Sequence, residues 1–416
     1  MENNSFVADD SKKLKSVFIN MGLAAAGLIF ALVLGELFLR AFFPLSRVSD
    51  PILGYRGNPG VRWDENGFRN ESALNKADIV ALGDSLTEGF NAEMNEAWPQ
   101  ALSNLSGKTV YNMGFGGYGP AQYYYLTEEA LSLEPDLIIV GFYLGNDLAN
   151  AFDAVYQNDN WRAFRDPSFN ASGTAATNRP FDEKNNETLM LQFGYVPNFW
   201  QMKILKTRLW LRDHSRLYSF LGDSTRQLRE KLKLVRGNDD MNKGIEEYLI
   251  NNQNIGFVYD AGNIKTILSI ADRLETVNIK NGKTGEGYRI TKDLFSEMDR
   301  QLKDKDKKLI IAVIPTKELV YGTYFKKVDA MGDVDVSFWE LLKQETELKD
   351  DFLNFCKNNR LLCIDTSAFQ VNGLRDNVKL YSETLESHPI GGGYQMIAEA
   401  IFNYLKEEKI FVTSKY

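Results

Sequence analysis

The residues of this chain that could do chemistry include a serine in a turn and a histidine preceded by an acid. Gly83-Asp84-Ser85 places a hydroxyl in a turn, and His388 follows Glu386 near the end of the chain. A serine hydroxyl is a weak nucleophile unless a base removes its proton, and an imidazole oriented by an acid is suited to that task. The two segments therefore indicate acyl-transfer chemistry, with Ser85 as nucleophile and His388 as base.

Two further segments offer hydrogen-bond donors for a negatively charged oxygen. The glycine-rich stretch 114–119 allows backbone N–H groups to approach a bound group closely, and Asn146 carries a side-chain amide. Taken singly, the first is also typical of a flexible loop and the second of a turn or a helix N-cap. All four segments lie at the end of a predicted strand or before a predicted helix, and this shared position favours a common site.

The acid that orients His388 has three candidates. Glu386 lies two residues before the histidine, Glu383 is the alternative, and a backbone carbonyl is the third. We expect Glu386 to fill the role. Asp84 and Asp147 are expected to be structural, with Asp84 accepting hydrogen bonds from amides of its own turn.

Lys317 follows a predicted strand, where its ammonium could meet an anionic glycan. Lysine is rarely buried, so we expect a surface position for it.

Short apolar runs precede the polar segments and predict buried parallel strands. These runs are 77–82, 109–112, 136–144, 307–316 and 361–365. Helical patterns separate them, near 98–105, 122–133, 337–357 and 391–407. Such an alternation predicts a parallel sheet with right-handed crossovers, and ligands bind beyond the carboxyl ends of its strands.

The alternation is interrupted in the middle of the chain, which predicts an inserted segment. The expected parts are a tail (1–16), a transmembrane signal-anchor (17–43), a connector (44–75), the first half of the sheet domain (76–150), a mostly helical insertion or cap (151–290) and the second half (291–416). Lysines and arginines are frequent between residues 203 and 236. They are typical of a solvated helix face, and the alternative is a segment on the membrane surface.

The run 17–39 is nearly continuously apolar and long enough to cross a bilayer. Lys12, Lys13 and Lys15 precede it, which favours a cytoplasmic amino terminus. The sequence thus predicts a single-pass membrane protein with its catalytic domain on the extracytoplasmic side. The alternatives are a cleaved signal peptide and a buried helix; the small residues 24–27 lie inside the run and speak against cleavage.

Composition narrows the class of protein further. The net charge of −8 and the charged fraction of 25% argue against a general nucleic-acid binder. Two histidines and two cysteines are too few for a metal site rich in these ligands. We expect Cys356 and Cys363 to be small buried residues, and a disulfide between them is the alternative.

The four segments together resemble the four blocks of the SGNH/GDSL hydrolase superfamily, over residues 76–150 and about 305–410. This resemblance implies a three-layer, flavodoxin-like α/β fold with helices on both faces of a parallel sheet, and no cofactor. It also implies that Ser85 is the nucleophile and His388 the base. The N–H groups of Ser85 and Gly117 and the side chain of Asn146 would form the oxyanion hole. The acid of this family is usually an aspartate, whereas Glu386 stands here.

Finer motifs narrow the resemblance. The segments 66–69, 96–99, 116–122 and 314–317 resemble a bacterial subgroup of membrane-anchored proteins linked to acylation of cell-envelope polysaccharides, including alginate O-acetyltransferase-like proteins. We therefore expect an esterase that acts on O-acyl esters, O-acetyl in particular, of an extracytoplasmic carbohydrate or lipid. The alternatives are an O-acyltransferase that uses the same acyl-serine intermediate beside a membrane acyltransferase partner, and an inactive glycan-binding or assembly protein.

Overall fold

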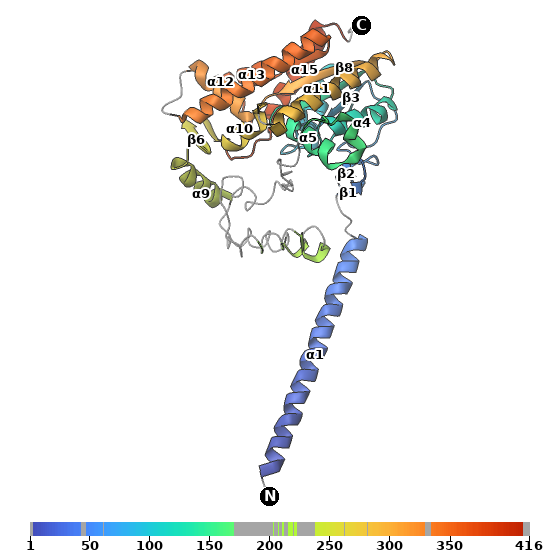
Figure 1. Ribbon diagram of the computed structural model, residues 1–416, viewed down its shortest axis with the longest axis vertical. Helices are drawn as coiled ribbons and strands as arrows, with labels where there is room; N and C mark the ends of the chain where they lie inside the picture. The colour runs from blue at the N-terminus through green and yellow to red at the C-terminus, as the bar shows by residue number, and fades with distance from the viewer. Residues whose placement is uncertain are drawn as a thin grey trace. The chain divides into compact units, whose positions relative to one another are not determined.

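The computed structural model describes residues 3–42, 47–60, 62–169, 203, 207, 210–211, 215–218, 220–222, 238–261, 263–280, 282–328 and 334–410. The chain divides into two compact units. We call Met1–Leu45 with Val196–Asp240 the anchor unit, and Ser46–Tyr195 with Met241–Tyr416 the sheet unit. Figure 1 follows the elements of both from the amino to the carboxyl terminus.

The anchor unit contains the long helix α1 (Asn3–Phe42). Within it, Ser16–Phe42 is the one stretch among the described residues that is long and apolar enough to cross a membrane. Glu36 interrupts this apolar stretch. Its carboxylate accepts hydrogen bonds from the Ser215 hydroxyl (2.9 Å) and from the N–H groups of Arg216 (3.0 Å) and Leu217 (2.9 Å), so it ties α1 to a later part of the same unit.

The sheet unit is built on five parallel strands in the order β4-β3-β5-β8-β9. Their bounds are β3 (Ile79–Gly83), β4 (Val110–Gly114), β5 (Leu137–Tyr143), β8 (Lys308–Ile314) and β9 (Leu362–Asp365). Counted along the chain this order is 2-1-3-4-5, which is flavodoxin-like. The predicted α/β class and the predicted strands are confirmed.

Helices cover both faces of the sheet because its strand residues alternate between two cores. Ile79 and Ala81 face a core shared with α3 (Trp98–Ser106) and α15 (Gly391–Glu407). Val80 and Leu82 face the opposite core. The helices that contribute to that second core include α4 (Pro120–Leu131), α11 (Gly282–Lys303), α12 (Lys317–Val328), α13 (Val336–Asn359) and α14 (Ser367–Arg375).

The remaining described elements are short or belong to the insertion. They are α2 (Ser85–Glu88), the 3-10 helices η1 (Met94–Glu96) and η2 (Asp159–Phe164), α5 (Asp147–Gln157), α9 (Asn238–Ile250) and α10 (Ala271–Val277). Two antiparallel hairpins pair β1 (Arg47–Asp50) with β2 (Gly54–Gly57) and β6 (Gly256–Ala261) with β7 (Ile264–Ser269). Neither hairpin was predicted, because their strands are short and lack the continuous apolar run of the central sheet.

The two cysteines form a disulfide, Cys356–Cys363, so the expectation of two separate buried thiols was wrong. Cys356 lies near the end of α13 and Cys363 in β9, and the chain reverses between them. The turn includes Arg360, which adopts a left-handed backbone conformation and ends the helix. This reversal brings the two sulfur atoms within bonding distance.

Candidate active site

A hydroxyl, an imidazole and a carboxylate that are far apart in the sequence meet in one hydrogen-bonded chain. The Ser85 hydroxyl lies 2.7 Å from Nε2 of His388. On the other side of the ring, Nδ1 lies 2.6 Å from Oε1 of Glu386. Ser85 follows β3 and His388 precedes α15, so the chain forms at the carboxyl edge of the sheet. An imidazole held in this way can remove the serine proton.

The nucleophile lies in a tight turn between β3 and α2. Asp84 caps α2 by accepting a hydrogen bond from the Leu86 N–H (2.9 Å), as expected for a structural acid. Gly83 is required here because a Cβ would overlap Oγ1 of Thr87. The turn is deeply buried, and Ser85 itself is only 1% exposed.

Burial raises the pKa values of two acids beside the nucleophile. The pKa of Asp84 rises to about 6, although a hydrogen bond from Leu86, the charge of His388 and a hydrogen bond from Asn146 oppose the rise. Burial likewise raises the pKa of Asp147, which accepts hydrogen bonds from the Tyr123 hydroxyl (3.0 Å) and the Tyr143 N–H (3.0 Å). The carboxylate in contact with the imidazole of His388 is that of Glu386.

The three predicted oxyanion donors are all at this edge. Ser85 is the first residue of α2 and Gly117 lies in the loop after β4, where its positive φ of 87° suits glycine. No acceptor for either N–H is found in the part of the chain that the structure describes. Asn146 follows the strand β5, and its amide is hydrogen-bonded to Asp84, next to the nucleophile.

The segment 382–388, which we call the acid–base loop, carries both Glu386 and His388 and contains neither helix nor strand. Burial tends to raise the pKa of Glu386. Hydrogen bonds from the side chain and N–H of His388, together with the charges of His388 and Lys317, nevertheless lower it to about 2. The alternative acid, Glu383, instead pairs with Lys379 at 2.7 Å. The structure thus places Glu386, and not Glu383, against the imidazole.

Lys317 is buried beneath the acid–base loop, so the expectation of a surface lysine was wrong. Its ammonium donates to the backbone carbonyls of Thr384 (2.7 Å), Glu386 (3.3 Å) and Ser382 (3.4 Å). Burial lowers its pKa to about 8, against the charges of Glu318 and Glu386. Three carbonyl acceptors compensate a buried ammonium, and in return the ammonium fixes the path of the loop.

Two arginines support the site from parts of the chain that sequence reasoning did not connect with it. Arg69, in the predicted connector, donates to the carbonyl of Ala92 (2.8 Å) and to that of Gly89 behind the nucleophile turn. Arg273, in the predicted insertion, donates to the carbonyl of Gly145 (3.1 Å), beside Asn146. Arg69 belongs to the motif 66–69, which supported only a family resemblance, and no sequence signal singled out Arg273.

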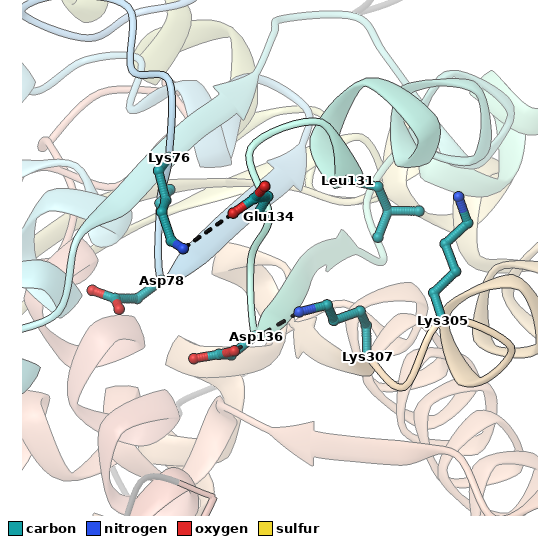
Figure 2. Close-up of a pocket in the computed structure, with 8 residues that line it drawn as sticks. Lys76, Asp78, Leu131, Glu134, Asp136, Lys305 and Lys307 are labelled. Atoms are coloured by element: carbon teal, nitrogen blue, oxygen red, sulfur yellow. Dashed lines mark hydrogen bonds and ion pairs between the residues drawn. The ribbon is translucent and has the colours of Figure 1, made fainter.

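A cavity of about 380 Å³ lies at the opposite edge of the sheet, before the amino ends of the strands. Figure 2 shows its lining lysines and acids, with Lys76 paired to Glu134 and Lys307 to Asp136. Since these charges compensate one another and no nucleophile–base pair lies among them, we do not place the active site there. No cluster of three metal-ligating side chains occurs in the described ranges.

Similar solved structures include a protein from Desulfitobacterium hafniense described as lipolytic and of the G-D-S-L family (TM-score 0.35, 13% identity, 80% of this chain and 100% of that one). A GDSL-like lipase from Bacteroides thetaiotaomicron gives a TM-score of 0.31 at 10% identity, over 79% and 88% of the two chains. A protein from Bacteroides fragilis described as an acylhydrolase gives 0.32 at 10% identity, over 84% and 91%. No family model and no curated protein matches the sequence.

Proposed function

We propose that this chain is a serine-dependent esterase that cleaves O-acyl esters, O-acetyl in particular, of an extracytoplasmic carbohydrate or lipid. The observation that carries the proposal is the hydrogen-bonded chain from the Ser85 hydroxyl through His388 to Glu386, with distances of 2.7 Å and 2.6 Å. The same three groups, in the same roles, perform acyl transfer on several unrelated folds.

In the first half of the reaction the Ser85 oxygen attacks the acyl carbonyl carbon, and Nε2 of His388 takes the hydroxyl proton. The carbonyl oxygen gains a negative charge, which the N–H groups of Ser85 and Gly117 and the amide of Asn146 stabilise. The ester C–O bond then breaks. His388 returns its proton to the departing alcohol oxygen, and the acyl group remains on Ser85.

In the second half a water molecule attacks the acyl-serine. His388 takes a proton from the water, the carboxylic acid leaves, and the Ser85 hydroxyl regains its proton from the imidazole. Glu386 stays ionised throughout at neutral pH because its pKa is about 2. Its charge keeps the proton on Nδ1 and stabilises the imidazolium that forms in each half.

The surroundings of the nucleophile favour a small acyl group. Gly116 lies beside Ser85, and a Cβ built on it would be 3.5 Å from the serine Cβ. The other side is occupied by His388, which is 7% exposed and lies 4.8 Å from the ring of Phe90. An acetyl group fits this restricted space better than a long acyl chain.

The assignment to the extracytoplasmic side has two supports. Ser16–Phe42 is long enough to serve as a membrane anchor after lysines 12, 13 and 15. The Cys356–Cys363 disulfide suits an oxidising compartment. The sheet unit should therefore be digested by protease added to spheroplasts that express the full chain. Protection until the membrane is broken would contradict this side of the membrane.

Esterase activity is tested with the full chain in detergent and neutral aryl acetates. We expect acetate release that is abolished in Ser85→Ala. Release that is equal in the two proteins would contradict the proposal.

The second candidate is an O-acyltransferase that passes the acyl group from Ser85 to a sugar hydroxyl. The burial of Ser85 (1% exposed) supports it, because a site that excludes water disfavours hydrolysis of the intermediate. The resemblance to proteins of polysaccharide acylation supports it too, and a membrane acyltransferase partner would then supply the acyl group. Incubation with an acyl donor and an acceptor oligosaccharide separates the two. Acyl release that is unaffected by the acceptor, without acylated sugar, would eliminate the transferase.

A further inference from the structure

Arg47 lies beside the nucleophile and has no carboxylate partner among the described residues. It is the first residue of β1 and is partly buried. The carbon of its guanidinium lies 5.2 Å from the ring centroid of Tyr55 and 5.1 Å from that of Phe115. Contact with two aromatic rings restricts the movement of a guanidinium, whose N–H groups can still donate to an anion at its edge.

Arg47 and Ser85 both lie next to Gly116. The point where a Cβ of Gly116 would lie is 3.6 Å from Nη2 of Arg47 and 3.5 Å from Cβ of Ser85. The same point is 3.2 Å from Oε2 of Glu88, so the space is narrow, but the guanidinium lies within about 7 Å of the Ser85 Cβ and a substrate bound at Ser85 would lie near both. One sugar or one aromatic ring is large enough to span the two groups.

The β1–β2 hairpin that carries Arg47 is attached to the glycine-rich loop. The hydroxyl of Tyr55 donates to the carbonyl of Gly116 (2.9 Å), and the hydroxyl of Tyr118 donates to the carbonyl of Tyr55 (2.6 Å). Arg47 is therefore held against the same loop that contributes Gly117 to the proposed oxyanion hole.

Glu88 is the acid nearest to the Cβ position of Gly116, and its carboxylate already has hydrogen-bond and ion-pair partners. Oε2 of Glu88 accepts the Gly116 N–H (2.7 Å), and its Oε1 is paired with Arg62 (3.2 Å). Arg69 adds a third guanidinium, and its side chain donates to the carbonyl of Glu88. Arg62 thus compensates the charge of Glu88, and Arg47 keeps no carboxylate partner among the described residues.

We propose that Arg47 forms an anion subsite, so that the ester substrate carries a carboxylate or phosphate group close to the acyl ester. The proposal rests on the proposed acyl-serine chemistry and adds the class of substrate. The guanidinium fork matches both anions, since each offers two oxygen atoms to parallel N–H donors. A uronic acid or a phosphate-bearing sugar has this chemistry.

The subsite is tested with three acetyl esters that differ in one group: 3-acetoxybenzoate, the neutral 3-acetoxybenzamide and 3-acetoxyphenyl phosphate. For the full chain in detergent at low salt, we expect kcat/KM to be at least about tenfold higher for an anionic ester than for the amide, since hydrogen bonds to charged groups contribute in this range. The better of the two anions identifies the group. Added salt should reduce the preference.

Arg47→Gln should bring the ratio of kcat/KM for the anionic ester to that for the neutral ester close to one, because the contact with the anion is lost. Arg47→Lys keeps the charge without the fork and should fall between. The matched control is Arg300→Gln, which removes the same charge from an exposed position on α11. A preference that persists in Arg47→Gln, or equal kcat/KM values for all three esters in the wild type, overturns the subsite.

A binding measurement separates this proposal from the proposed function. The amide analogue 3-acetamidobenzoate should bind the wild type more tightly than 3-acetamidobenzamide, and Arg47→Gln should bind both alike. Equal affinities in the wild type overturn the subsite. A third outcome is possible: the wild type, but not Arg47→Gln, binds the benzoate more tightly, and no ester is turned over. This outcome supports the subsite and counts against the esterase.

Discussion

The nucleophile and its base are held in position by two different means. The turn 83–90 is fixed by its own backbone, since the N–H groups of Gly89 (3.1 Å) and Phe90 (3.0 Å) both donate to the carbonyl of Ser85. The local hydrogen bonds of the acid–base loop run through side chains: the N–H of Glu386 donates to Oγ1 of Thr384 (3.2 Å) and that of His388 donates to Oε1 of Glu386 (3.0 Å). Three of its carbonyls also converge on the ammonium of Lys317, a residue that lies 65 to 69 positions earlier in the chain. One half of the site therefore depends on local backbone hydrogen bonds, whereas the other depends also on a distant side chain.

The two halves also differ in the direction in which the pKa of their acid is shifted. Burial raises the pKa of Asp84 to about 6, whereas hydrogen bonds and positive charges outweigh burial and lower that of Glu386 to about 2. The nucleophile turn thus contains an acid whose pKa is raised. The acid–base loop contains one whose pKa is lowered. The comparison predicts that substitutions in the loop change catalysis through His388, whereas those in the turn act on the fold and on the oxyanion.

The largest loss we predict among four single changes is that of Glu386→Gln. The variant keeps the shape of the side chain but removes the charge that holds the proton on Nδ1, so kcat should fall by about 10³–10⁴-fold. Glu383→Gln is the matched control, because Glu383 contacts Lys379 and not the imidazole. Steady-state kinetics with an aryl acetate measures both. Equal small losses in the two variants would mean that a backbone carbonyl, and not Glu386, orients His388.

A smaller loss is expected on the nucleophile side for Asn146→Ala. Removal of one oxyanion donor should lower kcat by about 10²–10³-fold and leave KM nearly unchanged, since the amide acts on charge that develops only in the transition state. The same kinetic assay applies. If KM rises and kcat stays constant, Asn146 contacts the ground-state substrate instead.

Lys317→Met tests the tether of the acid–base loop directly. With the three carbonyls released, His388 should be misplaced, and kcat should fall by about 10–10²-fold at little change in KM. The rate at which a fluorophosphonate labels Ser85 should fall by a similar factor. A mere loss of stability would lower the amount of folded protein and would leave the labelling rate of the folded protein unchanged. Lys326→Met, near the end of the same helix, is the control. Unchanged kcat in a folded Lys317→Met variant would show that the loop is held without the ammonium.

The last substitution, Asp84→Asn, tests the pH dependence of stability and not kcat. Because the pKa of Asp84 is raised from 3.8 to about 6, the folded state binds more protons than the unfolded state between these two pH values. The free energy of unfolding therefore falls as pH rises from about 4 to 6, by at most about 3 kcal/mol, and the Asn variant lacks this contribution. Thermal unfolding of both proteins across this pH range should show the wild type losing stability relative to the variant. Parallel profiles would mean that Asp84 stays ionised.

The sequence predicts best what local patterns determine. Each central strand is a short apolar run between polar turns, and all five were found, together with the four helices predicted near 98–105, 122–133, 337–357 and 391–407. The final helix was placed at residues 391–407, as observed. Ser85, His388 and Glu386 were also nominated from short motifs, because reactive residues follow the carboxyl ends of parallel strands.

What the sequence missed depends on contacts between distant segments. Lys317 is buried only because three carbonyls of a later loop surround it, and general burial preferences point the other way. The Cys356–Cys363 disulfide requires a chain reversal that composition does not reveal. Arg47 lies in a hairpin within a region rich in glycine, proline and charge, where no strand pattern stands out.

Ser85 and His388 should act as one unit, and acylation of the enzyme shows whether they do. Full-length protein mixed briefly with an aryl acetate at low pH, where deacylation slows, should gain the mass of one acetyl group, and peptide mapping should place that group on Ser85. Ser85→Ala should gain none, and His388→Ala should acylate at least about 10³-fold more slowly. An acetyl group on another residue, or equal acylation of Ser85 in the presence and absence of the imidazole, would contradict the account.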